Sequence, residues 1–162
     1  DRCYAPIDVT ITISGLAGMV IDDGAAGYTI VDDEYSVTFT GINFACSGWV
    51  PLSSTGQVNL DLDHATNPGY CLSIGLRLEY DDEAGNWFIR ADPDEGDIEY
   101  GIILSDCGDI DSRTDYLVSI SRFDFPNIEC GDNKISGTGT VTVTDWFSSL
   151  TMGTADVTVT VN

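Results

Sequence analysis

Basic residues are scarce in this chain. Its 162 residues include 6 Lys and Arg residues together and one His, against 27 Asp and Glu residues, and the formal net charge is −21 at pH 7. A surface with this charge repels the phosphates of nucleic acids and the headgroups of anionic lipids. We therefore expect no binding to nucleic acid or to an anionic membrane surface.

Long hydrophobic runs are also absent. No stretch approaches the roughly 18 apolar residues of a transmembrane helix, so we expect no membrane insertion. The hydrophobic fraction of 43% is nevertheless ordinary for a globular protein, and a chain of this length can bury a core. We expect residues 1–162 to form a single domain. The first residue is Asp1 rather than Met, as in a mature secreted chain or an excised fragment.

The chain lacks the periodicity of long helices and instead alternates between apolar and polar residues. Residues 7–14, 72–80 and 155–161 alternate with a period of two, which is typical of half-buried strands. Turn residues rich in Gly, Asp and Pro separate eight to ten such strands. The pattern predicts an all-β fold, namely an antiparallel β-sandwich or a jelly-roll-like domain. Residues 71–104 are expected to form a three-strand meander, and Asp145 to cap one helical turn.

Motifs for catalysis are missing. The chain has no Gly-x-Ser-x-Gly elbow and no nucleotide-binding loop, and its single histidine, His64, precedes an Asn-Pro-Gly turn. Glu79 and Glu99 lie on expected strands and are the only carboxylate pair that we consider for glycan hydrolysis. Because acidic residues are so abundant, such pairs arise by chance, and we expect no enzymatic activity.

The five cysteines do not form a Cys-x-x-Cys pair, and one histidine cannot complete a Cys/His zinc cluster of the usual spacing. Their wide spacing is typical of disulfides in an oxidising compartment. We expect Cys107 to pair with Cys130 and Cys46 with Cys71, which leaves Cys3 unpaired or bonded to another subunit. The alternative is five reduced thiols in a cytosolic protein.

Asp dominates the acidic residues, with 21 Asp against 6 Glu. Short carboxylates in turns are suitable ligands for Ca²⁺, which takes six to eight oxygens. If the turns around residues 81–83 and 106–111 lie at the same end of the domain, they could share an ion. The alternative is a set of acidic turns that keep the surface solvated or adapted to salty water. The candidate ligands are Asp81, Asp82, Glu83, Asp92, Asp94, Asp97, Asp106, Asp109 and Asp111.

Both terminal strands show little of the protection by lysine, proline or bulges that a sheet edge usually has. An unprotected terminal strand can complete the sheet of a neighbouring copy, and a contact of this kind propagates into a filament. The alternative is that both strands pair inside their own sheet. The candidate inter-subunit residues are Cys3, Ile7, Val9, Ile11, Ile13, Val157, Val159 and Val161.

These features favour a non-enzymatic extracellular structural subunit. We expect it to assemble with copies of itself into a filament, a pilus-like fibre, a surface layer or a virion decoration. The alternative is a calcium-dependent β-sandwich module that binds glycans or a cell surface. Its aromatic candidates are Trp49, Trp87, Trp146, Tyr70 and Phe125, although tryptophans in a sandwich usually belong to the core.

Overall fold

A computed structural model describes residues 7–21, 27–42, 55–65, 69–81, 83–92, 101–124, 137–145 and 148–161. These ranges contain twelve strands and one 3-10 helix, η1 (Ile110–Ser112). Within them, no helix has the length and apolar character needed to cross a bilayer. The strands are β1 (Ile7–Ser14), β2 (Val20–Ile21), β3 (Tyr28–Ile30), β4 (Tyr35–Ile42), β5 (Thr55–His64), β6 (Cys71–Asp81), β7 (Asn86–Asp92), β8 (Gly101–Leu104), β9 (Arg113–Ile120), β10 (Phe123–Asp124), β11 (Gly137–Asp145) and β12 (Thr151–Val161).

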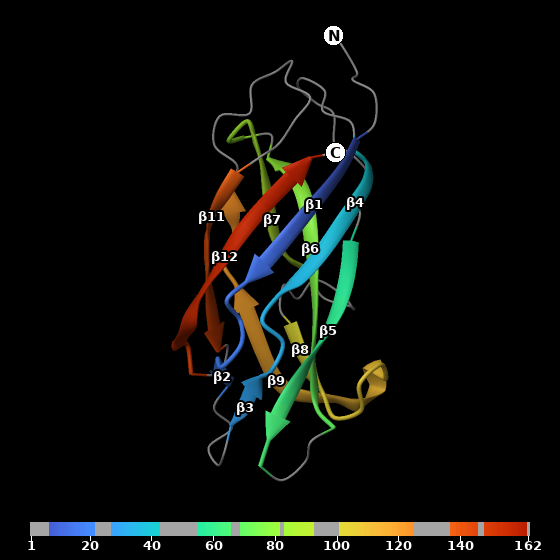
Figure 1. Cartoon of the computed structure of the whole chain (residues 1–162), viewed down its shortest axis with the longest axis vertical. Helices are drawn as coiled ribbons and strands as arrows, with labels where there is room; N and C mark the ends of the chain where they lie inside the picture. The colour runs from blue at the N-terminus through green and yellow to red at the C-terminus, as the bar shows by residue number, and fades with distance from the viewer. Residues whose placement is uncertain are drawn as a thin grey trace.

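The strands form one curled antiparallel sheet in the order β2-β3-β5-β6-β8-β9-β11-β12-β1-β4, with β7 and β10 beside this path. In Figure 1 the strands β12, β1 and β4 lie in front of β6 and β7, and β11 lies at their left. This arrangement confirms the predicted all-β antiparallel class. The structure contains more strands than expected because β2 and β10 have only two residues each, too few for alternation to reveal them.

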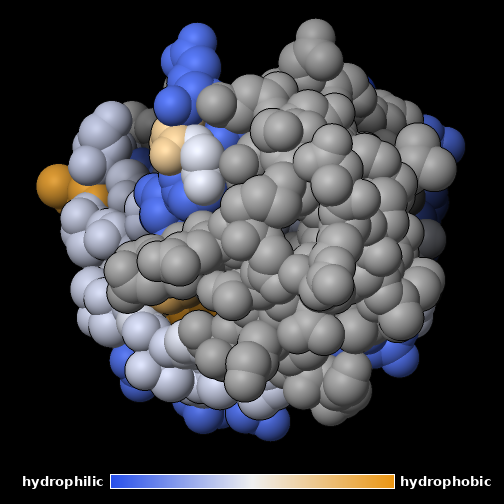
Figure 2. Space-filling view, turned by 90° about the horizontal axis from the view of Figure 1, so that it is seen from above, coloured by the Kyte–Doolittle hydropathy of each residue, from blue (hydrophilic) through white to orange (hydrophobic). Residues whose placement is uncertain are grey.

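The core follows the alternation of the sequence. In β1 the buried residues are Val9, Ile11 and Ile13, and in β12 they include Val157 and Val159. The polar residues between them point away from the core. Seen from one end of the molecule, the visible described surface is mostly hydrophilic, with only small hydrophobic areas (Figure 2). The inward-facing residues of the sheet thus form one shared hydrophobic core.

The predicted meander is wrong in one respect: β7 and β8 do not pair with each other. Both pair with the same edge of β6, end to end, since Asp92 lies opposite Gly75 and Ile102 lies opposite Ser73. Residues 93–100 are therefore an insertion between two segments of one ladder. The sequence signals of a hairpin and of an interrupted strand are the same, because each consists of an apolar run, a turn and another apolar run.

The terminal strands are not edge strands. β1 lies between β12 and β4, and β12 lies between β11 and β1. Neither strand is therefore an exposed edge of the sheet in the single chain, and donation of a terminal strand stays a prediction. Alternation shows only that one face of a strand is buried, and it is the same for interior and edge strands. The alternative, in which both strands pair inside their own sheet, describes the structure of the single chain.

The first half of β6 is buried on both faces. Leu72 faces the main core, whereas Cys71 belongs to a small second cluster on the outer face. That cluster also contains Ile102 and Leu104 of β8, and Leu117 of β9 packs against it. The alternation in the sequence predicted a strand with one buried and one exposed face. This prediction is correct only for the part of β6 after Gly75, where Arg77 and Glu79 are partly exposed.

The β11–β12 connection is closed by two backbone hydrogen bonds. The N–H of Ser149 donates to the carbonyl oxygen of Asp145 (2.9 Å), and the N–H of Asp145 donates to that of Leu150 (3.0 Å). Ser149 adopts a φ of 58°. Asp145 is the buried last residue of β11, and residues 146–147 of the predicted helical turn lie outside the described residues.

Candidate functional sites

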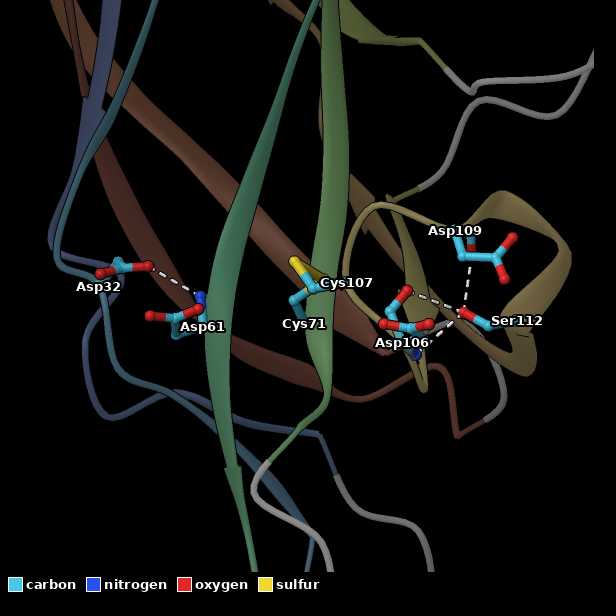
Figure 3. The surroundings of a disulfide bond; sticks show 7 residues. All are labelled: Asp32, Asp61, Cys71, Asp106, Cys107, Asp109 and Ser112. Carbon is cyan, nitrogen blue, oxygen red and sulfur yellow. Dashed lines mark hydrogen bonds between the residues drawn. A yellow bond between two sulfur atoms is a disulfide. The ribbon is translucent and has the colours of Figure 1, made fainter.

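A disulfide within the described residues joins Cys71 to Cys107, with their Cα atoms 5.5 Å apart. Both predicted pairings, Cys107 with Cys130 and Cys46 with Cys71, are therefore wrong. β8 places Leu104 opposite Cys71, and the loop that follows returns Cys107 to the outer face of β6 (Figure 3). Cys3, Cys46 and Cys130 lie outside the described residues. A disulfide is consistent with an oxidising environment.

The loop that carries Cys107 is held by hydrogen bonds to Ser112. The backbone N–H of Asp106 donates to Ser112 Oγ (2.9 Å), and the single O–H of Ser112 is shared between the backbone carbonyls of Asp106 (3.0 Å) and Asp109 (2.7 Å), as Figure 3 shows. The N–H of Ser105 also donates to the carbonyl oxygen of Ser112 (3.1 Å). The loop is thus fixed by its own backbone as well as by the disulfide, and it lies over the second apolar cluster.

The acidic side chains of this loop do not converge. Asp106, Asp109 and Asp111 are all exposed, and one carboxylate oxygen of Asp109 accepts a hydrogen bond from the N–H of Asp111 (3.0 Å). No group of three or more His, Cys, Asp or Glu residues that could hold a metal is found within the described ranges. Calcium binding therefore remains a prediction, and the carboxylates of this loop are not arranged around a common metal-binding position.

Asp81 already has partners from the protein. One carboxylate oxygen accepts hydrogen bonds from the N–H groups of Glu83 (3.0 Å) and Ala84 (3.1 Å), which fix the turn after β6. The other oxygen lies 2.8 Å from Nη2 of Arg122. The hydrogen bond from Arg122, followed by that from Ala84, holds the pKa of Asp81 below its usual value. Asp81 therefore stabilises a turn and an ion pair.

The two acidic turns cannot share an ion. Asp81 ends β6, whereas Cys71, which is bonded to the loop of Asp106 and Asp109, begins it. The strand has 11 residues, and at about 3.3 Å per residue its ends lie roughly 30 Å apart. Asp92 ends β7. The other candidate ligands, Asp82, Asp94 and Asp97, lie outside the described residues.

Glu79 accepts hydrogen bonds from two arginines on the outer face of the sheet. Its Oε1 lies 3.2 Å from Nη1 of Arg77 and 2.8 Å from Nη2 of Arg90. Partial burial raises the pKa of Glu79, but the hydrogen bonds from Arg90 and Arg77 outweigh it, so that the pKa is lower than usual. A carboxyl held in its ionised form is poorly suited to act as a general acid. Glu99 lies outside the described residues.

Sequence reasoning missed an aromatic cluster around the only histidine. The rings of Tyr28 and His64 have centroids 4.6 Å apart, and Tyr28 also contacts Tyr70 (5.0 Å) and Tyr116 (5.5 Å). His64 and Tyr28 are opposite each other in the β3–β5 ladder, a pairing that cannot be read from the sequence. Of the predicted platform residues, Trp87 is buried in the core, and Trp49, Trp146 and Phe125 lie outside the described residues.

Five of the candidate inter-subunit residues of β1 and β12 are core residues in the single chain. Val9, Ile11, Ile13, Val157 and Val159 are at most 2% exposed. In the backbone ladders Ile7 lies opposite Ile42, and Val161 lies opposite Val9; Cys3 lies outside the described residues. A contact between copies through these buried residues requires that a strand leave its own sheet. Comparison of the chain with protein-family models, with curated proteins and with solved structures finds no match.

Proposed function

We propose that the chain is an extracellular structural subunit that assembles with copies of itself by exchanging its N-terminal strand. The observation that carries the proposal is the position of β1, which fills an interior slot between β12 and β4. If β1 left this slot, the facing edges of two long strands would be unpaired. The β1 strand of another copy has the shape and sequence to refill it.

Exchange would preserve the contacts that hold β1. In the slot, Ile11 lies opposite Val159 on one side and Val37 on the other. Hydroxyl pairs join β1 to β4 on the outer face, with Thr10 Oγ1 3.0 Å from Thr38 Oγ1 and Thr12 Oγ1 2.8 Å from Ser36 Oγ. A strand from a second copy would form the same contacts, so exchange costs little at equilibrium.

The connection after β1 is suited to act as a hinge. Gly15 and Gly18 have φ values of 84° and 88°, which glycine adopts without strain. Hydrogen bonds from the N–H of Leu16 to the carbonyl of Asp33 (2.9 Å) and from that of Gly18 to the carbonyl of Ile30 (2.8 Å) anchor the turn in the closed chain. When each copy gives its strand to the next, the exchange is open-ended and yields a filament. The disulfide supports an extracellular location.

The experiment is a cross-link between different copies. One chain carries Ile11→Cys, and a second chain, distinguished by a mass tag, carries Val37→Cys; these positions are opposite each other in the β1–β4 ladder and buried, so a contact between outer faces cannot join them. Opposed residues of an antiparallel ladder lie about 4.5–5.5 Å apart at Cα, within the range of a disulfide. After the two chains are mixed, assembled and oxidised, we expect linked species that contain both chains on a non-reducing gel.

The matched control pairs the Ile11→Cys chain with a tagged Leu60→Cys chain, because Leu60 is also buried but lies on β5. Wild-type chains report the background from the native cysteines. Strand exchange requires mixed cross-linking clearly above both controls. The proposal is wrong if the chains fail to associate, or if they associate with mixed cross-linking no greater than in the controls.

The aromatic cluster of Tyr28, His64, Tyr70 and Tyr116 favours a second candidate function, glycan binding. Tyr70, Tyr116 and His64 are partly exposed, and aromatic rings with polar tips are suited to a surface that is both apolar and wet. Glycan-array binding that is lost in Tyr70→Ala but retained in Tyr70→Phe would support this candidate. Absence of glycan binding in the wild-type chain would exclude it for the glycans on the array.

A further inference from the structure

The strands β11, β12, β1 and β4 pair side by side and form what we call the front layer, whose outer face is built almost entirely from hydroxyl side chains. In the ladders of β11, β12, β1 and β4, rows such as Thr138–Thr158–Thr12–Ser36 run from strand to strand. We call this surface the hydroxyl face. Its members are Thr138, Thr140, Thr142 and Thr144 of β11, Thr154, Thr158 and Thr160 of β12, Thr10, Thr12 and Ser14 of β1, and Ser36, Thr38 and Thr40 of β4.

Charge is nearly missing from the hydroxyl face. Between its members, only two outward positions carry a charge, those of Asp8 and Asp156, and both are exposed. The chain as a whole carries 27 acidic and 6 basic residues. We call the paired strands β5, β6 and β7 the back layer. Its outer face, by contrast, carries ion pairs such as Arg77–Glu79 and Arg122–Asp81. Any two copies repel each other through most of their surfaces, and least where their hydroxyl faces meet.

We propose that the hydroxyl face is a contact surface for the same face of a second copy. The contact is isologous, so each residue of the face meets a residue of the identical face on its partner. It packs threonine methyl groups together and places few like charges opposite each other. It is a second contact, independent of strand exchange, which uses the edges of β1 rather than its outer face.

The geometry of the face is suitable for this contact. Four strands at about 4.8 Å spacing and roughly 27 Å in length present about 500 Å² per copy. Two copies together therefore bury about 1,000 Å², the lower bound for a specific interface. The hydroxyl pairs Thr10–Thr38 and Thr12–Ser36 restrain side chains before contact, which lowers the entropy lost on association.

The test is sedimentation velocity over a concentration series with a charge placed in the face. Thr158 lies near the middle, opposite Thr12 on one side and Thr138 on the other. In an isologous contact each substitution is present on both copies, so Thr158→Asp places two added charges in one interface. It should therefore weaken dimerisation by about tenfold or more. The matched control, Asn59→Asp, adds the same charge at an exposed strand position of the back layer and should change the dissociation constant less than about twofold.

A second variant separates folding from association. Thr158→Val retains a branched side chain without charge, fits a strand, and should dimerise at least as well as the wild type. Salt at about 1 M, which shortens the Debye length to about 3 Å, should restore dimerisation of folded Thr158→Asp. A monomeric wild type, or equal effects of Thr158→Asp and Asn59→Asp, would overturn the proposal. A dimer without cross-links between Ile11→Cys and Val37→Cys chains would support this contact and exclude strand exchange.

Discussion

The guanidinium carbon of Arg122 lies 3.7 Å from the centre of the Phe88 ring. The same guanidinium lies 2.8 Å from Asp81 and 2.7 Å from Asp124, measured from Nη2 to the carboxylate oxygens. Asn86 also donates a hydrogen bond to Asp124 (2.9 Å). Arg122 therefore ties together the end of β6, the start of β7 and the short strand β10.

Replacement of Arg122 should destabilise the fold. Arg122→Ala removes the cation–π contact with Phe88 and both ion pairs, and because the side chain is 39% exposed, we expect a loss of about 1 kcal/mol in the free energy of unfolding. Arg122→Lys retains the charge but not the planar, bidentate geometry, and should lose part of this amount. Urea denaturation of the three proteins measures the difference, and equal midpoints would contradict the assigned role.

Stability should fall when the solution is made acidic. The hydrogen bond from Arg122 is the main cause that lowers the pKa of Asp81. For Asp124 partial desolvation raises the pKa, but hydrogen bonds from Arg122 and Asn86 lower it by more; Glu79 is lowered as described. Carboxyls with lowered folded-state pKa values stabilise the fold above their unfolded values, about 4, and this stabilisation is lost as the pH falls through the folded values.

This pH dependence can be assigned by a variant. Thermal unfolding between pH 7 and pH 2 should show a decline below about pH 4 in the wild type. Arg122→Ala should show a shallower decline, because its Asp81 and Asp124 no longer have the arginine that lowers their pKa values. The same slope in both proteins would show that other carboxyls control acid stability.

The disulfide should contribute substantially to stability. Cys71 and Cys107 are separated by 36 residues, and closure of a loop of this size restricts the unfolded chain by an amount worth about 2–4 kcal/mol. Cys107→Ala is the better probe because Cys107 is exposed whereas Cys71 is buried. We expect a lower midpoint in guanidinium chloride for the variant, and unchanged stability would mean that the loop is held by the Ser112 hydrogen bonds alone.

Gly139 should not tolerate a side chain. A methyl group at this position would collide with the ring of Phe123, whereas at Gly137, two residues earlier in the same strand, nothing lies within 4 Å of the added atom. Overpacking of this kind typically costs about 1–3 kcal/mol. We expect Gly139→Ala to lower the melting temperature and Gly137→Ala to leave it unchanged or slightly raised. Equal melting temperatures would show that the Phe123 ring moves aside without cost.

The sequence was sufficient for the fold class and for the two faces of each long strand. The inward positions of β1 and β12 could be predicted because the side-chain period of a strand is two, and a mistake of one residue would place threonine in the core. Strand neighbours could not be predicted in this way. Nothing in residues 7–14 indicates that β12 and β4 lie on either side of them, since pairing depends on the whole topology.

The candidate sites were harder to predict because acidic side chains serve several purposes. Asp81 binds Arg122 and two backbone N–H groups, Asp32 accepts a hydrogen bond from the N–H of Asp61 (2.7 Å), and Asp109 caps a turn. Each of these positions has the composition of a metal ligand. The disulfide was mispredicted for a similar reason: spacing alone does not show that β8 brings Cys107 back to Cys71.

The division between β7 and β8 makes the fold a natural display scaffold. Both segments pair with one edge of β6, and their neighbouring ends lie opposite Gly75 and Ser73, two residues apart on that strand. The pairing of β7 and of β8 with β6 therefore does not depend on the number of residues between Asp92 and Gly101. A graft of a foreign peptide between Asp92 and Gly101 should leave the sheet intact. In an assembly of many copies, the grafted peptide would be presented once per subunit at a regular interval.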